Sequence, residues 1–116
     1  MQPTYKEIAE QFSKGNFSFC YSHFGDEVEW KIIGSDSVKG KNEVIAQCEK
    51  MTTEIGSSTL NNLNTISENE LIAIEGNCHY IGPDEKAGEV RYCDVYRFEN
   101  SKIASITSYC IDTKVK

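Results

Sequence analysis

The chain has 116 residues and a formal net charge of −6 at pH 7, from 12 basic and 18 acidic side chains. This length fits a single domain with a hydrophobic core of its own. An acidic chain without a basic face cannot neutralise phosphates, so nucleic acid is not expected as a partner. No apolar run approaches the roughly 20 residues that a membrane span needs, so we expect no membrane association and a soluble, cytoplasmic protein.

The five cysteines form an odd set with no CxxC pair and no short repeating interval. This spacing argues against a disulfide framework and against a zinc module. We therefore expect reduced thiols in the cytosol, and neither a metal nor a cofactor. The cysteines are Cys20, Cys48, Cys78, Cys93 and Cys110.

Three helices are predicted in the first half of the chain. Residues 4–14 carry apolar side chains at the i, i+3, i+4, i+7 spacing of an amphipathic helix. A second, shorter helix with an aromatic stripe follows from Asn16, which is a plausible N-cap. Residues 42–51 return to the helical period and form a third helix that ends near Gly56.

Strands account for the rest. Residues 28–33 predict a strand that carries Trp30 on its apolar face, followed by a polar loop over residues 34–42. From residue 57 onward only strands and turns are predicted, including a turn over residues 82–88. Helices followed by strands imply an α+β domain in which the helices pack on one face of an antiparallel sheet.

Residues 90–111 predict a β-hairpin with a carboxylate, Asp94, inside it. Alternation places Asp94 on one face with three aromatic side chains, and the two nearby arginines on the other. A carboxylate buried there costs roughly a few kcal/mol unless it is protonated or hydrogen-bonded, so its pKa is expected above the usual value of about 3.9. The cost of burying Asp94 among aromatic side chains favours a pocket on this face of the sheet. The alternative is a filled core in which Asp94 bonds a tyrosine hydroxyl or a backbone amide.

The same parity brings side chains from neighbouring strands onto the face of Asp94. The resulting lining is mostly apolar with a few polar groups, as in small-molecule sites. Asp94 is the candidate catalytic residue. The predicted ligand-binding residues are Trp30, Ile74, Cys78, Tyr92, Tyr96, Ile106, Ser108 and Cys110.

A cysteine nucleophile is an alternative that needs a base alongside. Cys78 and Cys110 share the face of Asp94, but the chain has only two histidines. His79 has the parity of the outer face, and His23 lies close to Glu27 on a helix. Both histidines are therefore interpreted as surface or interface groups.

Two motifs extend the interpretation to a family. They are GKNEVI at residues 40–45 and DVYRFENSKI at residues 94–103. Together with the order of elements, they resemble the nuclear transport factor 2-like superfamily, in its SnoaL-like and ketosteroid-isomerase-like branch. The resemblance covers residues 1–116 as one SnoaL-like domain. It implies a cystatin-like α+β barrel, with a cone-shaped, curled antiparallel sheet and three helices from the N-terminal half over its concave face.

The resemblance also implies a function. Members of this superfamily look like cones that admit a small, mostly apolar ligand, and many pair as homodimers through the outer sheet face. The isomerase branch has an Asp, any, aromatic, Arg, Phe run, which this chain matches at Asp94. Its first-helix tyrosine falls near Ile8 and its carboxylate base falls on Trp30 or Lys31, so steroid isomerisation is disfavoured.

Three functions are compatible with these residues. The favoured one is a protein of the SnoaL-like type that binds a small hydrophobic molecule. The second is an isomerase, cyclase or hydratase that uses Asp94 as an acid or as a hydrogen-bond donor to an oxyanion. The third is a ligand-free dimerisation module whose cone is filled. A homodimer is expected through a partly apolar outer face made by Ala73, Cys93, Val95, Thr107 and Tyr109.

Overall fold

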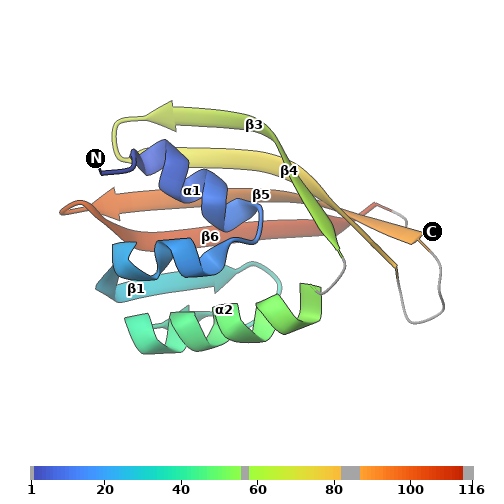
Figure 1. Cartoon of the computed structure of the whole chain (residues 1–116), viewed down its shortest axis with the longest axis horizontal. Helices are drawn as coiled ribbons and strands as arrows, with labels where there is room; N and C mark the ends of the chain where they lie inside the picture. Colours follow the sequence, from blue (N-terminus) through green and yellow to red (C-terminus); the bar gives the residue numbers. More distant parts are fainter. Residues whose placement is uncertain (1, 56–57, 82–86, 114–116) are drawn as a thin grey trace.

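The computed structural model describes residues 2–55, 58–81 and 87–113. Within these ranges the chain forms three helices and six strands, and the predicted α+β class is confirmed. All the helices lie on one face of the sheet (Figure 1). In chain order the elements are α1 (Tyr5–Ser13), η1 (Phe17–His23), β1 (Phe24–Ile32), β2 (Val38–Lys39), α2 (Lys41–Ile55), β3 (Thr59–Glu68), β4 (Leu71–Ile81), β5 (Ala87–Glu99) and β6 (Lys102–Asp112).

The sheet is mixed. Its order is β2-β1-β6-β5-β4-β3, and the strands from β3 to β6 form the predicted antiparallel meander. β1 pairs with β6 in parallel, with Trp30 beside Ile106, so the expectation of an antiparallel sheet is wrong for this pair. A parallel pair needs a long crossover connection, and α2 with the meander supplies it. Alternation within one strand reveals its face but not the direction of a partner so distant in sequence.

Two elements differ from their predicted form. η1 is a 3-10 helix of seven residues, in which Phe17 and Cys20 are buried. Side chains three residues apart lie above one another in a 3-10 helix, so these two share one face. The loop predicted over residues 34–42 contains the two-residue strand β2 and the start of α2. The predicted end of α2 at Gly56, and most of the predicted turn over residues 82–88, lie outside the described residues.

The first helix follows its sequence signals closely. Thr4 caps α1, since its hydroxyl accepts from the Glu7 backbone N–H at 3.1 Å and Glu7 accepts from the Thr4 N–H at 2.8 Å. Ile8, Ala9, Phe12 and Ser13 form its buried face. The cap therefore sets where α1 begins, and its apolar stripe sets which side faces the sheet.

Phe12 lies at the centre of the core. Its ring packs edge-on against Trp30 with centroids 5.1 Å apart and against Tyr96 at 5.9 Å, and it meets Phe17 at 4.8 Å.

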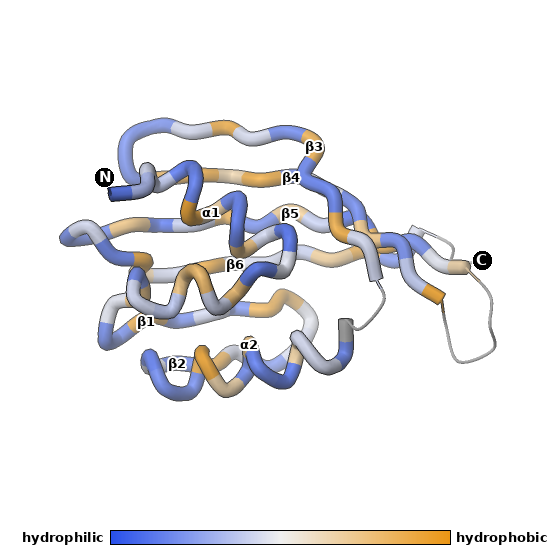
Figure 2. The backbone as a smooth tube through the Cα atoms, in the orientation of Figure 1, coloured by the Kyte–Doolittle hydropathy of each residue, from blue (hydrophilic) through white to orange (hydrophobic). Residues whose placement is uncertain are grey.

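Hydrophobic and polar positions alternate along the central strands (Figure 2). Tyr21 of η1 also donates a hydrogen bond to the Glu49 carboxylate of α2, which ties these two helices together. No helix among the described residues is long and apolar enough to cross a membrane.

Truncating Phe12 tests this arrangement. We expect Phe12→Ala to lower the free energy of unfolding by about 3–5 kcal/mol, because it removes a buried ring. Phe19 is 41% exposed and serves as the matched control, with an expected loss below about 1 kcal/mol for Phe19→Ala. Urea unfolding of both variants measures the difference. Equal losses would show that Phe12 is not a core residue.

Candidate functional site

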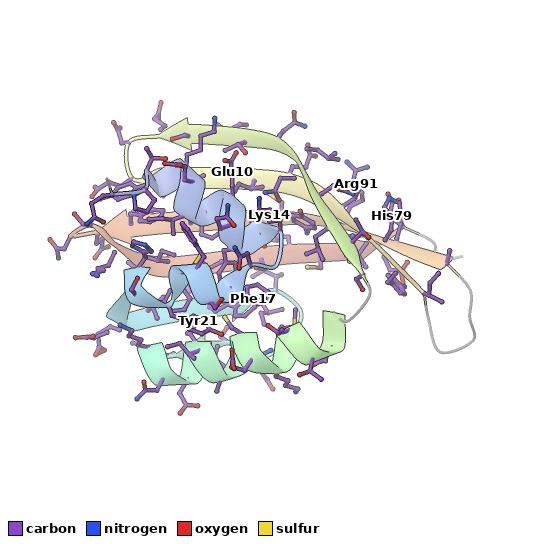
Figure 3. The ribbon with its side chains drawn as sticks, in the orientation of Figure 1. Glu10, Lys14, Phe17, Tyr21, His79 and Arg91 are labelled. Atoms are coloured by element: carbon purple, nitrogen blue, oxygen red, sulfur yellow. The ribbon has the colours of Figure 1, made fainter. Side chains whose placement is uncertain are left out.

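A cavity of about 430 Å³ lies between the helices and the inner face of the sheet. This volume falls within the range of small-molecule sites, roughly 300–1,000 Å³. Figure 3 shows Phe17, one of its wall residues, on η1 between α1 and α2. The full lining is Phe12, Ser13, Phe17, Trp30, Ile32, Ser35, Gln47, Lys50, Met51, Glu54, Leu60, Cys78, Val90, Tyr92, Asp94, Ser108 and Cys110.

Asp94 is the buried acid of this cavity, with 7% of its surface exposed. The Ser13 hydroxyl donates to Asp94 Oδ2 at 2.7 Å, and Ser13 Oγ lies 2.5 Å from the Tyr96 hydroxyl. A serine has one hydrogen to donate, so when Ser13 bonds Asp94 the Tyr96 hydroxyl is the donor to Ser13. A relay of two hydroxyl groups therefore ends on the carboxylate.

A second relay reaches Asp94 from β1. The Trp30 indole N–H donates to Ser108 Oγ at 2.9 Å. This leaves the hydroxyl hydrogen of Ser108 free to donate, and Ser108 lies directly opposite Asp94 across the β5–β6 pair. The Ser108 side chain hydrogen-bonds Asp94 and favours its charged form.

Burial raises the pKa of Asp94, and hydrogen bonds from Ser108, Ser13 and Tyr96 oppose that rise. The predicted direction of the pKa is therefore confirmed. No lysine, arginine or histidine of the described chain forms an ion pair with Asp94. Arg91 and Arg97 are exposed on β5, as their parity predicted. Hydroxyl groups alone thus compensate this carboxylate.

Tyr92 connects the cavity to the first helix. Its hydroxyl donates to Asn62 Oδ1 at 2.7 Å, and the Asn62 amide donates to the backbone oxygen of Glu10 at 2.9 Å. A side chain at Gly76, opposite Tyr92 on β4, would collide with the Tyr92 ring. The glycine and the asparagine together fix the position of Tyr92 in the wall.

The structure separates the predicted ligand-binding residues into two groups. Asp94 and five of the others line the cavity, namely Trp30, Cys78, Tyr92, Ser108 and Cys110. Ile74, Tyr96 and Ile106 are instead fully buried in the packed core and are not among its lining residues. Parity assigns a residue to a face of the sheet, but it does not tell how far the helices cover that face.

The helical half of the site could not be assigned from strand parity. Ser13 is the most important residue missed, because it is the direct partner of Asp94. A signal for it exists, since Ser13 lies four residues after Ala9 and so extends the buried stripe of α1. Of the lining residues that α2 contributes, Met51 belongs to the predicted apolar period of residues 42–51, whereas Gln47, Lys50 and Glu54 carry no comparable signal.

The cysteines of the cavity are not activated nucleophiles. Desolvation raises the pKa of both the Cys78 and Cys110 thiols, which favours their neutral form. Both histidines fall within the described residues, and neither lines the cavity. His79 is exposed and faces Glu89 at 3.7 Å, towards the end of the sheet that the helices leave uncovered (Figure 3). Thiol–histidine chemistry is therefore not supported.

A second hollow, of about 590 Å³, lies beside β1 and the β5–β6 turn. Charged side chains such as Asp26, Lys31 and Arg97 line it, and all three are exposed. None of its polar lining residues is buried, so it lacks the desolvated polar group that distinguishes the cavity of Asp94.

These features agree with the comparisons to known proteins. The SnoaL-like domain family matches residues 5–106, so the chain belongs to this family. A search of curated proteins found no match. The solved structures below show the same fold.

The crystal structure of an NTF2-like protein of unknown function from Cytophaga hutchinsonii is 49% identical, with a TM-score of 0.87 over 90% of this chain and 93% of that chain. A second NTF2-like protein of unknown function, from Burkholderia pseudomallei, is 20% identical with a TM-score of 0.72 over 89% of this chain and 84% of that one. A SnoaL-like polyketide cyclase candidate from Jannaschia sp. CCS1 is 7% identical, with a TM-score of 0.77 over 95% and 90% of the two chains. The last two similarities concern the fold alone.

The pH dependence of stability tests the state of Asp94. Its folded-state pKa is raised, so the unfolded chain loses its proton first as pH rises, and the native state loses stability from about pH 4 upward. Asp94→Asn removes this loss. We expect the free energy of unfolding of the variant to exceed that of the wild type increasingly as pH rises above about 4, measured by urea unfolding.

The exposed acid Asp26 offers a control with the same change of charge, and Asp26→Asn should show no such gain. A marked loss of stability in Asp94→Asn at neutral pH would contradict the account, since it would mean that the native state needs the ionised carboxylate.

Proposed function

We propose that the protein binds one small, mostly apolar molecule in the cavity and that Asp94 is the polar group that orients it. The observation that carries this proposal is a buried carboxylate, without a cation, in the wall of an aromatic-lined cavity. A carboxylate in such a place is costly for packing alone, and perturbed acids in cavities mark functional sites more often than other positions.

A filled cone, as in a ligand-free dimerisation module, is less well supported. Such a module requires Phe12, Trp30 and the tyrosines to fill the cone, and Phe12 and Trp30 do pack against each other with centroids 5.1 Å apart. Both nevertheless line a cavity of about 430 Å³. The space left beside them is large enough for a small ligand.

A second candidate function is acid catalysis on a bound ligand. The raised pKa of Asp94 supports it, because an acid that keeps its proton can donate it to a developing oxyanion. Glu54 of α2 is the other carboxylate in the lining, and its side chain is exposed. Binding requires only the cavity, whereas catalysis also requires a base, so binding is the first proposal.

A neutral fluorescent probe tests ligand binding. N-phenyl-1-naphthylamine should bind with saturation and change the emission of Trp30, the only tryptophan of the chain and a wall residue. Cys110→Phe places a large ring in the wall and should weaken binding about tenfold or more. Cys93→Phe makes the same change outside the cavity and should leave binding unchanged. Absence of saturable binding, or equal effects of the two variants, would count against the proposal.

We also propose that the protein forms a homodimer through the outer face of the sheet. Ala73, Val95 and Thr107 lie in one row across β4, β5 and β6, and Cys93 lies beside Tyr109 in the next. A partly apolar surface of this kind suits a symmetric pair. The predicted cytoplasmic location is compatible with the five free cysteines.

Sedimentation tests the dimer. The wild type should sediment as a dimer at micromolar concentration, and Val95→Glu should shift it to a monomer by placing charges opposite each other across the two-fold axis. Phe19→Glu changes an exposed aromatic residue on the helical side and should leave the dimer intact. A monomeric wild type would remove the proposal.

A further inference from the structure

We propose that the ligand of this cavity carries a protonated amine on an apolar body, and that the amine pairs with the carboxylate of Asp94. This inference rests on the proposed function and specifies the class of ligand. It is argued from the charge balance of the site, the direction of its hydrogen bonds and the aromatic character of its walls.

The charge balance of the site is incomplete. Asp94 is 7% exposed, and its partners within the described chain are the hydroxyl groups of Ser13, Ser108 and Tyr96. Buried carboxylates are ordinarily paired with a cation. Asp94 lines the cavity, so a cation on a ligand is the group that could complete the pair.

The hydrogen bonds are directed towards a negative charge. With Asp94 ionised, Ser13 donates to its carboxylate and Tyr96 donates to Ser13, while Trp30 donates to Ser108 and leaves the Ser108 hydrogen for the carboxylate. An ionised carboxylate accepts on both oxygens and donates nothing. Both relays therefore favour a carboxylate that accepts, and an ammonium group is a stronger donor to such an acceptor than a neutral group.

The walls suit a cation as well. Four aromatic rings line the cavity, those of Phe12, Phe17, Trp30 and Tyr92. Aromatic faces attract ammonium groups placed within about 6 Å of the ring centroid, most strongly when the cation is desolvated. The same rings bury the apolar body of a ligand, so one set of side chains serves both parts of the molecule.

The two charged side chains that α2 contributes to the cavity lining do not oppose this assignment. Lys50 and Glu54 lie four residues apart on α2, and their opposite charges offset each other. The whole chain carries a net charge of −6, which attracts a cationic ligand and repels an anionic one.

Three probes with the same number of non-hydrogen atoms test the class of ligand. 2-Phenylethylamine is a cation at neutral pH, 2-phenylethanol is neutral with a hydroxyl group, and acetophenone is neutral and only accepts hydrogen bonds. Each is titrated against the wild type by displacement of N-phenyl-1-naphthylamine. We expect the amine to bind about tenfold more tightly than the alcohol and acetophenone. Asp94→Asn should abolish this preference while retaining the affinity for the alcohol, and Asp26→Asn should preserve it.

Other results overturn the inference in distinguishable ways. Tighter binding of acetophenone would mean that Asp94 is a protonated donor to a carbonyl, and equal binding of all three probes would mean that it takes no part in recognition. In the first case the proposed function stands in full, and in the second case ligand binding stands but the orienting role of Asp94 fails. If neither the naphthylamine nor any of the three probes binds, the proposed function fails as well. The ratio of affinities in the wild type decides the question even if Asp94→Asn does not fold.

Discussion

The structure depends on the hydrogen bonds that compensate the buried carboxylate of Asp94 in place of a cation. Asp94 lies in the middle of β5 and would lose its hydration on folding. Two relays of neutral groups compensate it, one from α1 through Ser13 and one from β1 through Trp30 and Ser108. Because the relays come from different elements, both of them form only when α1, β1 and β6 are packed around β5.

This requirement links the site to the packing of the first helix. Phe12 and Ser13 are consecutive residues at the end of α1, the first packed against Trp30 and Tyr96 and the second bonded to Asp94. A short helix thus contributes an apolar anchor and a polar one within a single turn. The amide of Asn62 adds a third tie to the same turn through the Glu10 carbonyl. The cavity lies beside this anchor, so a bound ligand would contact groups that the fold already holds rigid.

Local patterns predicted most of the fold and half of the site. The stripe of α1 and the alternation of β5 identified Phe12 and Asp94 correctly as inward-facing, because both depend on the geometry of a single element. The parallel pairing of β1 with β6 depends on contacts between distant segments and left no local signal. Ser13 was missed for a related reason, since the turn of helix that meets Asp94 is decided by three-dimensional packing. Ile74 and Ile106 had the correct face, but the helices leave only part of that face open.

The pKa of Asp94 is the quantity on which this account depends. It can be followed directly by carbon-13 NMR of the Asp94 carboxyl group across a pH titration. Burial without a cation predicts a midpoint above the usual value of about 3.9, and a further rise in Ser108→Ala, which removes a hydrogen bond that favours the charged form. A midpoint at or below the usual value, unchanged in Ser108→Ala, would contradict the account.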